Sequence, residues 1–140
     1  MPPLVRTLLA LLVAVLVAFA VIGAVEAINT RLHPAPSGFA MSDPAQFEAY
    51  IRALPVRALA IVLAGYALAA LVAGAIAARV APVHPGRHAL LAGALLFAAT
   101  LANVLSVPQP WAFEVLSLAI PVPLAVVGSR LVERRMRTRA

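Results

Sequence analysis

Between Thr7 and Val25 the chain carries no charged residue, and nearly every side chain in this run is apolar. A helix crosses the hydrocarbon core of a bilayer with about 20 mostly apolar residues, so the run is long enough for one crossing. Of the 140 residues, 64% are hydrophobic and 11% are charged. A chain of this length could not bury that much apolar surface in one water-facing core. We therefore predict an integral membrane protein.

Three further segments qualify by the same measure, which gives four predicted spans: roughly residues 4–27, 56–78, 89–107 and 111–129. These runs do not alternate as the strands of a membrane β-barrel do. The predicted fold is therefore all-α, a single membrane domain over residues 1–140 built as a bundle of four transmembrane helices. Residues 28–55 form a long loop after the first span, and residues 130–140 form a basic tail.

The arginines predict how the spans are oriented, because the cytoplasmic segments of membrane proteins carry the excess of basic residues. One predicted face has a net charge of +7 and the other −1, within a total of +6. We expect both termini on the cytoplasmic side of a bacterial inner membrane. The tail should contact anionic lipid of the inner leaflet through five arginines: Arg130, Arg134, Arg135, Arg137 and Arg139.

The first span has a second interpretation, as a cleaved signal peptide. Arg6 would be its basic region, and the sequence VEA before Ile28 would be its cleavage site. The uncharged run is longer than the signal-peptide core of about 7–15 residues, so we favour a retained helix.

The long loop contains the pattern of a short amphipathic helix at about residues 44–54. Asp43 is placed to cap it, Pro44 suits its first turn, and Gln46 stands at the capping-box position. Its apolar residues recur at helical spacing: Phe47, Tyr50, Ile51 and Leu54. We expect this helix on the outer surface of the bilayer, as a lid over the bundle or as a docking surface for a partner or a lipid headgroup.

Four polar residues on four different spans are predicted to lie at similar depth. The rise of about 1.5 Å per residue puts Glu26 and Arg57 at the outer boundary, with Asn103 and Glu114 about one turn deeper. Arg57 is the natural partner of either carboxylate, and Asn103 is placed to donate to Glu114. A charge in hydrocarbon is costly unless it is paired or solvated. The cluster is therefore a structural clamp or a site for a headgroup, a proton or a small cation.

Small residues recur at every fourth position in three of the spans. The rows are Ala10, Ala14 and Ala18; Gly65, Ala69, Ala73 and Ala77; and Ala94, Ala98 and Ala102. Such rows let helices approach closely in lipid, either within one chain or between copies. In the last span, Pro121 and Pro123 each remove a backbone donor, which predicts a kink that serves as a packing bend or a hinge.

The sequence contains no pattern that indicates an enzyme or a cofactor site. There is no cysteine, His33 is predicted on the face opposite His84 and His88, and we expect these histidines on the surface. No nucleophile–base pair, paired catalytic carboxylates or nucleotide motif is recognisable, so we expect no enzyme activity, no cofactor and no metal. The pI near 11.6 follows from arginines beside the spans, so we expect no nucleic-acid partner.

The order of these features resembles the uncharacterised small four-helix inner-membrane proteins that are common in bacteria. The resemblance rests on VEAINTRLHPAPSG after the first span, DPAQFEAYIRALP before the second and GYALAALVAGAIAAR within it. It covers most of the chain and implies the bacterial inner membrane, but no activity. Small multidrug transporters also have four helices and a carboxylate in the first. Theirs lies in mid-span, whereas Glu26 lies at the outer end.

We therefore expect a non-enzymatic accessory, scaffold or lipid-contacting protein. Its partners would be membrane lipids, together with further copies of the chain or another membrane protein. The alternative is a small transporter or channel subunit that uses the polar cluster.

Overall fold

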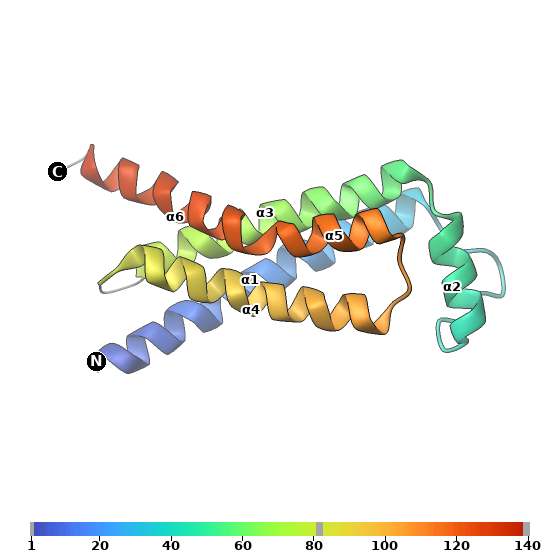
Figure 1. The fold of residues 1–140 in the computed structure, drawn as a ribbon, viewed down its shortest axis with the longest axis horizontal. Helices are drawn as coiled ribbons and strands as arrows, with labels where there is room; N and C mark the ends of the chain where they lie inside the picture. The colour runs from blue at the N-terminus through green and yellow to red at the C-terminus, as the bar shows by residue number, and fades with distance from the viewer. Residues whose placement is uncertain (1, 81–82, 139–140) are drawn as a thin grey trace.

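The computed structural model describes residues 2–80 and 83–138, and helices account for most of them (Figure 1). The elements are α1 (Pro3–Leu32), α2 (Pro44–Ala53), α3 (Val56–Val80), α4 (Pro85–Ser106), α5 (Trp111–Ala119) and α6 (Pro121–Arg137). Four helical segments are long and apolar enough to cross a membrane: α1, α3, α4, and α5 together with α6. The prediction of an all-α chain with four such segments is confirmed.

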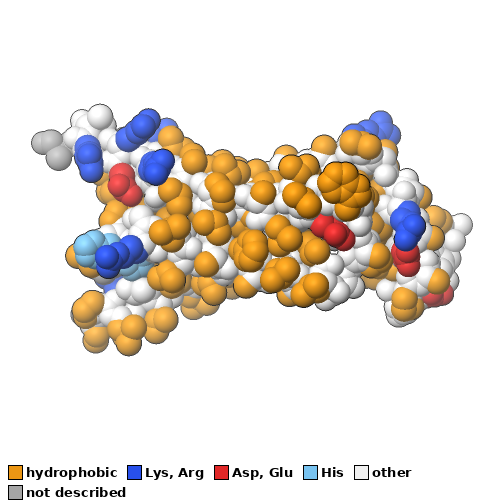
Figure 2. Space-filling model, in the orientation of Figure 1, with side chains coloured by type: hydrophobic (Ala, Val, Ile, Leu, Met, Phe, Trp, Pro, Cys, Tyr) orange, Lys and Arg blue, Asp and Glu red, His pale blue; other side chains and the backbone are white. Residues whose placement is uncertain are grey.

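The four long segments form one bundle, and α2 lies across one end of it (Figure 1). The chain termini lie at the opposite end, so we call the two ends the α2 end and the terminal end. Hydrophobic side chains cover most of the middle of the bundle, whereas basic side chains gather near both ends (Figure 2). Large apolar side chains such as Leu8 (57% exposed) and Leu16 (58% exposed) point outward. The surface therefore matches the polarity profile of a bilayer.

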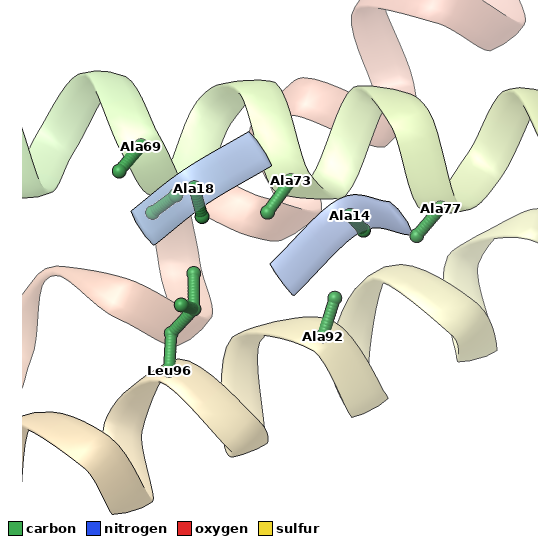
Figure 3. Packing of buried hydrophobic residues seen from close by; sticks show 8 residues of the cluster. Ala14, Ala18, Ala69, Ala73, Ala77, Ala92 and Leu96 are labelled. Atoms are coloured by element: carbon green, nitrogen blue, oxygen red, sulfur yellow. The ribbon is translucent and has the colours of Figure 1, made fainter. Parts of the chain in front are cut away.

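The core consists almost entirely of alanine. Figure 3 shows how these small side chains meet between α1, α3 and α4. The buried cluster contains Ala14, Ala18, Ala69, Ala70, Ala73, Ala77, Ala92 and Leu96. The small-residue rows of α1 and α3 thus pack within the chain, whereas Ala94, Ala98 and Ala102 of α4 face outward. With so little side chain between them, the helix backbones come close enough for extensive dispersion contact.

Helices α3 and α6 cross with their backbones in close contact. A Cβ on Gly74 would lie 1.9 Å from the carbonyl oxygen of Ala125, and one on Gly128 would lie 2.1 Å from that of Leu71. Each glycine therefore faces the backbone of the other helix, and neither position has room for a side chain. Glycine is required here for close approach.

The fourth apolar segment is interrupted at Ile120. Helix α5 ends at Ala119, and α6 begins at Pro121. Both Pro121 and Pro123 fall in the first turn of α6, where backbone N–H groups have no partner within the helix. The two prolines therefore mark the start of a helix, and the break between α5 and α6 lies at Ile120, the residue before them.

Helix α1 continues past residue 27, the predicted end of the span, to Leu32. The Oγ1 of Thr30 donates to the carbonyl of Glu26 at 2.9 Å, and the N–H of His33 donates to that of Asn29 at 2.9 Å. A hydropathy pattern locates the border of an apolar run, whereas a helix ends where its backbone hydrogen bonds end. The additional turn carries Asn29, Thr30 and Arg31 and leads into the connection to α2.

The glycines of the crossing make a stability prediction. Replacing Gly74 or Gly128 with alanine forces α3 and α6 apart, and we expect each change to lower the free energy of unfolding by about 1–3 kcal/mol. Gly23→Ala is the matched control, because a Cβ at Gly23 meets nothing within 4 Å. That substitution should stabilise α1 by about 0.5–1 kcal/mol. Thermal unfolding in detergent measures the stability of all three variants. Unfolding midpoints that are equal in the Gly74, Gly128 and Gly23 variants would contradict the close crossing.

Candidate functional site

The start of α2 is fixed by Asp43 and Gln46. One oxygen of Asp43 accepts from the N–H groups of Ala45 at 3.0 Å and Gln46 at 3.3 Å. The Nε2 of Gln46 donates to the other oxygen of Asp43 at 2.9 Å, and its Oε1 accepts from the N–H of Ala40 at 3.0 Å. The predicted cap is present in a modified form, since the glutamine bonds to the capping side chain and to the preceding turn. The cap therefore orients the whole helix.

Helix α2 turns its apolar side toward the bundle. All four residues of the predicted stripe are partly buried and line a cavity of about 290 Å³ at the α2 end: Phe47, Tyr50, Ile51 and Leu54. The hydroxyl of Tyr50 donates to the carbonyl of His33 at 3.0 Å, which ties α2 to the end of α1. On the opposite side, Glu48 and Arg52 form an exposed ion pair. Helix α2 is thus a cover for the space beneath it, which we call the α2 cavity.

A second cavity of about 240 Å³ lies further into the bundle, and we call it the deep cavity. Its apolar wall consists of Phe19, Ile22, Ala69, Ala70, Leu96, Ala99 and Pro121, with Thr100 beside them. Three residues line both cavities, namely Glu26, Tyr66 and Asn103. They come from α1, α3 and α4, so three helices meet where the cavities adjoin. We call these three residues the junction.

The junction combines an acid with two neutral polar groups. The Nδ2 of Asn103 donates to the hydroxyl of Tyr66 at 3.5 Å, and the ring of Tyr66 lies 6.3 Å from that of Phe113. Among residues 2–80 and 83–138, the one ion pair joins Glu48 and Arg52, so no basic side chain pairs with Glu26. The junction therefore presents an exposed carboxylate without a basic partner beside a half-buried, hydrogen-bonded tyrosine and asparagine.

The structure brings together two of the four residues of the predicted polar cluster. Glu26 and Asn103 share both cavities, whereas Glu114 lines neither of them. The Nε of Arg57 donates to Nε2 of His33 at 3.2 Å, and Asn103 bonds to Tyr66. The expected pairs of Arg57 with a carboxylate and of Asn103 with Glu114 are therefore wrong.

The length of α1 explains the changed partner of Arg57. Because α1 continues to Leu32, its end reaches the level of Arg57 and presents His33 to it. Glu26 lies seven residues earlier on the same helix, about 10 Å lower along the axis.

Sequence reasoning missed two residues of the site. Tyr66 is a polar aromatic residue in a helix of small apolar ones, and no spacing rule links it to Glu26. Gln109 lies in the turn between α4 and α5 and lines the α2 cavity. Its Oε1 is buried and has no hydrogen-bond partner within the described residues. A buried acceptor without a partner is costly. Gln109 also lines a shallow pocket with Arg52, Pro108 and Pro110.

The terminal end holds a histidine contact that the sequence did not predict. His88 is 7% exposed, with its Nε2 3.0 Å from Oγ1 of Thr7 and its Nδ1 3.2 Å from the carbonyl of His84. The expectation of a surface position is wrong for His88, because α1 and α4 both begin here and enclose the ring, whereas His84 is exposed. Within the part of the chain that the structure describes, no group of three potential ligands could hold a metal ion.

The basic tail is partly described. Arg130, Arg134, Arg135 and Arg137 are exposed, and Arg139 lies outside the described residues. Arg135 lines a groove of about 290 Å³ between α3 and α6, whose other walls are apolar. Gly128 and Leu71, which are in close contact, both line this groove.

No protein-family model, curated protein or solved structure matches the chain. The candidate site is therefore defined by its own geometry: two adjoining cavities, a three-residue junction and the cover formed by α2.

The contact between Tyr50 and His33 can be tested through the opening of α2. Because the chain has no cysteine, one introduced as Val62→Cys reports access to the α2 cavity. Adding Tyr50→Phe removes the hydrogen bond to His33, and we expect labelling by a water-soluble maleimide to quicken about two- to tenfold. Ala60→Cys, at an exposed position outside the cavity, is the control and should be unaffected. An unchanged rate at residue 62 would show that this bond does not hold the cover.

Proposed function

We propose that this chain is a non-enzymatic integral protein of the bacterial inner membrane that holds a lipid or lipid-like amphiphile at its α2 end. It would act as an accessory component, with both termini in the cytoplasm and the α2 end facing outward. The observation that carries the proposal is the pair of adjoining cavities with the junction between them.

The size and lining of the cavities support an amphiphile. Pockets for whole small molecules measure about 300–1,000 Å³, whereas the deep cavity measures about 240 Å³ and the α2 cavity about 290 Å³. Each is suited to part of a ligand. The deep cavity has an apolar wall that suits a hydrocarbon chain, and the junction supplies hydrogen-bonding groups that suit a headgroup.

The position of Phe19 supports entry from the bilayer. This side chain lines the deep cavity and is also 48% exposed on the outer face of α1. Helix α1 packs mainly on α3 and much less on α4. The wall between α1 and α4 is therefore the thinner one, and an amphiphile in the membrane would meet the cavity there.

The terminal end supports the proposed orientation and a second lipid contact. Four exposed arginines follow the last apolar stretch, where they would lie at the anionic inner leaflet and contribute about 1 kcal/mol each. The groove beside Arg135 combines apolar walls with a positive charge at one end. That combination suits an acyl chain and an anionic phosphate.

Filling the deep cavity tests the proposal. Ala99→Leu places a larger side chain in the cavity wall, and Ala98→Leu makes the same change at the exposed neighbouring position. We expect native mass spectrometry of protein released from its own membranes to show a retained lipid that Ala99→Leu loses severalfold. Ala98→Leu should retain it. Equal retention by the two variants would place the bound lipid elsewhere.

A small transporter is the second candidate, and the position of Glu26 favours it. An unpaired carboxylate between two cavities is suited to exchange a proton against a cation. If the chain transports, Glu26→Gln should abolish the uptake of an organic cation driven by a pH gradient in proteoliposomes. Glu114→Gln, outside both cavities, should leave uptake within about twofold of the parent. Uptake that survives Glu26→Gln would exclude the junction as its site.

A further inference from the structure

We propose that the amphiphile held at the α2 end carries a primary amine, and that it is an aminophospholipid. This inference rests on the proposed amphiphile-binding function and adds the chemistry of the headgroup.

The first argument is the set of unused acceptors around the α2 cavity. The Oε1 of Gln109 is buried without a partner, and the carboxylate of Glu26 lines the same cavity without an ion pair in the described residues. Asn103 uses its Nδ2 donor on Tyr66, which leaves its Oδ1 as an acceptor. These oxygens require donors. A primary ammonium supplies three N–H donors and the positive charge that Glu26 lacks.

The second argument is the sign of the charge. Among the described residues that line the two cavities there is no arginine, lysine or histidine, and the acid is Glu26. A purely anionic headgroup would face the exposed carboxylate of Glu26 without a compensating cation, and like charges repel. A quaternary ammonium would balance the charge but has no N–H for Gln109. The primary amine satisfies both requirements.

The third argument is the source of the amine. Most of the wall of the deep cavity is apolar, and its edge at Phe19 is exposed on the face of the bundle that would meet lipid. A water-soluble amine would leave this apolar wall uncovered, whereas a lipid covers it with an acyl chain. A phospholipid therefore fits the whole site better than a free amine.

The test compares three headgroups on identical acyl chains. The full chain is placed in nanodiscs that contain equal amounts of phosphatidylethanolamine, phosphatidylcholine and phosphatidylglycerol, and native mass spectrometry identifies the lipid retained after release. We expect phosphatidylethanolamine to be retained about tenfold over phosphatidylcholine, because only the former donates hydrogen bonds. Equal retention of these two, or preference for phosphatidylglycerol, would overturn the proposal.

Three variants locate the preference. Glu26→Gln removes the charge, and Gln109→Leu removes the buried acceptor. Each should bring the ratio of retained phosphatidylethanolamine to retained phosphatidylcholine close to one. Glu114→Gln changes a carboxylate that lies outside both cavities, and this variant should keep the preference for phosphatidylethanolamine. Thermal midpoints in detergent separate loss of binding from loss of fold, and if Glu26→Gln does not fold, Gln109→Leu carries the test. A preference that persists in both site variants would show that the amine binds elsewhere.

The outcomes separate this inference from the proposed function. Loss of retained lipid in Ala99→Leu without any headgroup preference in the parent would leave an amphiphile site that does not recognise an amine. If Ala99→Leu retained as much lipid as the parent, both the proposed amphiphile site and the amine preference assigned to it would be wrong. Titration with ethanolamine tests the lipid source, since binding as tight as that of phosphatidylethanolamine would overturn it in favour of a soluble amine.

Discussion

The bundle depends on how closely its helices approach one another, and the crossing of α3 and α6 is the limiting case. Gly74 and Gly128 each lie against the backbone of the opposite helix, so this contact has no side chain that can yield. It fixes the distance between the two helices, and the alanine core between α1, α3 and α4 continues the same close packing. Tight packing near the middle and the terminal end places the adjoining cavities toward the α2 end.

The candidate site is produced by the ends of helices. Helix α1 runs past its apolar stretch to Leu32, which brings His33 to Arg57 and to Tyr50 of α2. Because Arg57 bonds to His33, it is not paired with Glu26 in the described structure. Glu26, about 10 Å lower on α1, has no basic partner among the described residues. The end of α1 thus contacts both the cover formed by α2 and the arginine at the start of α3.

Much of the fold could be predicted, because it depends on local chemistry. Hydropathy located the four long helices, and the cap at Asp43 with its apolar stripe located α2. The site was predictable only in part. The similar depth of Glu26 and Asn103 could be calculated from the rise per residue along each helix, which needs only the position of a residue in the sequence. The pairing of Arg57 with His33, the position of Tyr66 and the burial of His88 depend on how helices rotate and where they end. No hydropathy pattern contains that information.

The order of the helices along the chain has a consequence for assembly in the cell. Helix α6 follows α1 to α5 in the chain, yet it supplies Ala125 and Gly128 to the contact on α3. Until it arrives, Gly74 faces no partner in the chain, and Pro121 has not yet completed the wall of the deep cavity. A ribosome-bound chain that already contains α1 to α4 would thus hold the residues of the alanine core before the deep cavity has its full wall. The wall is complete only after α6 has joined the bundle.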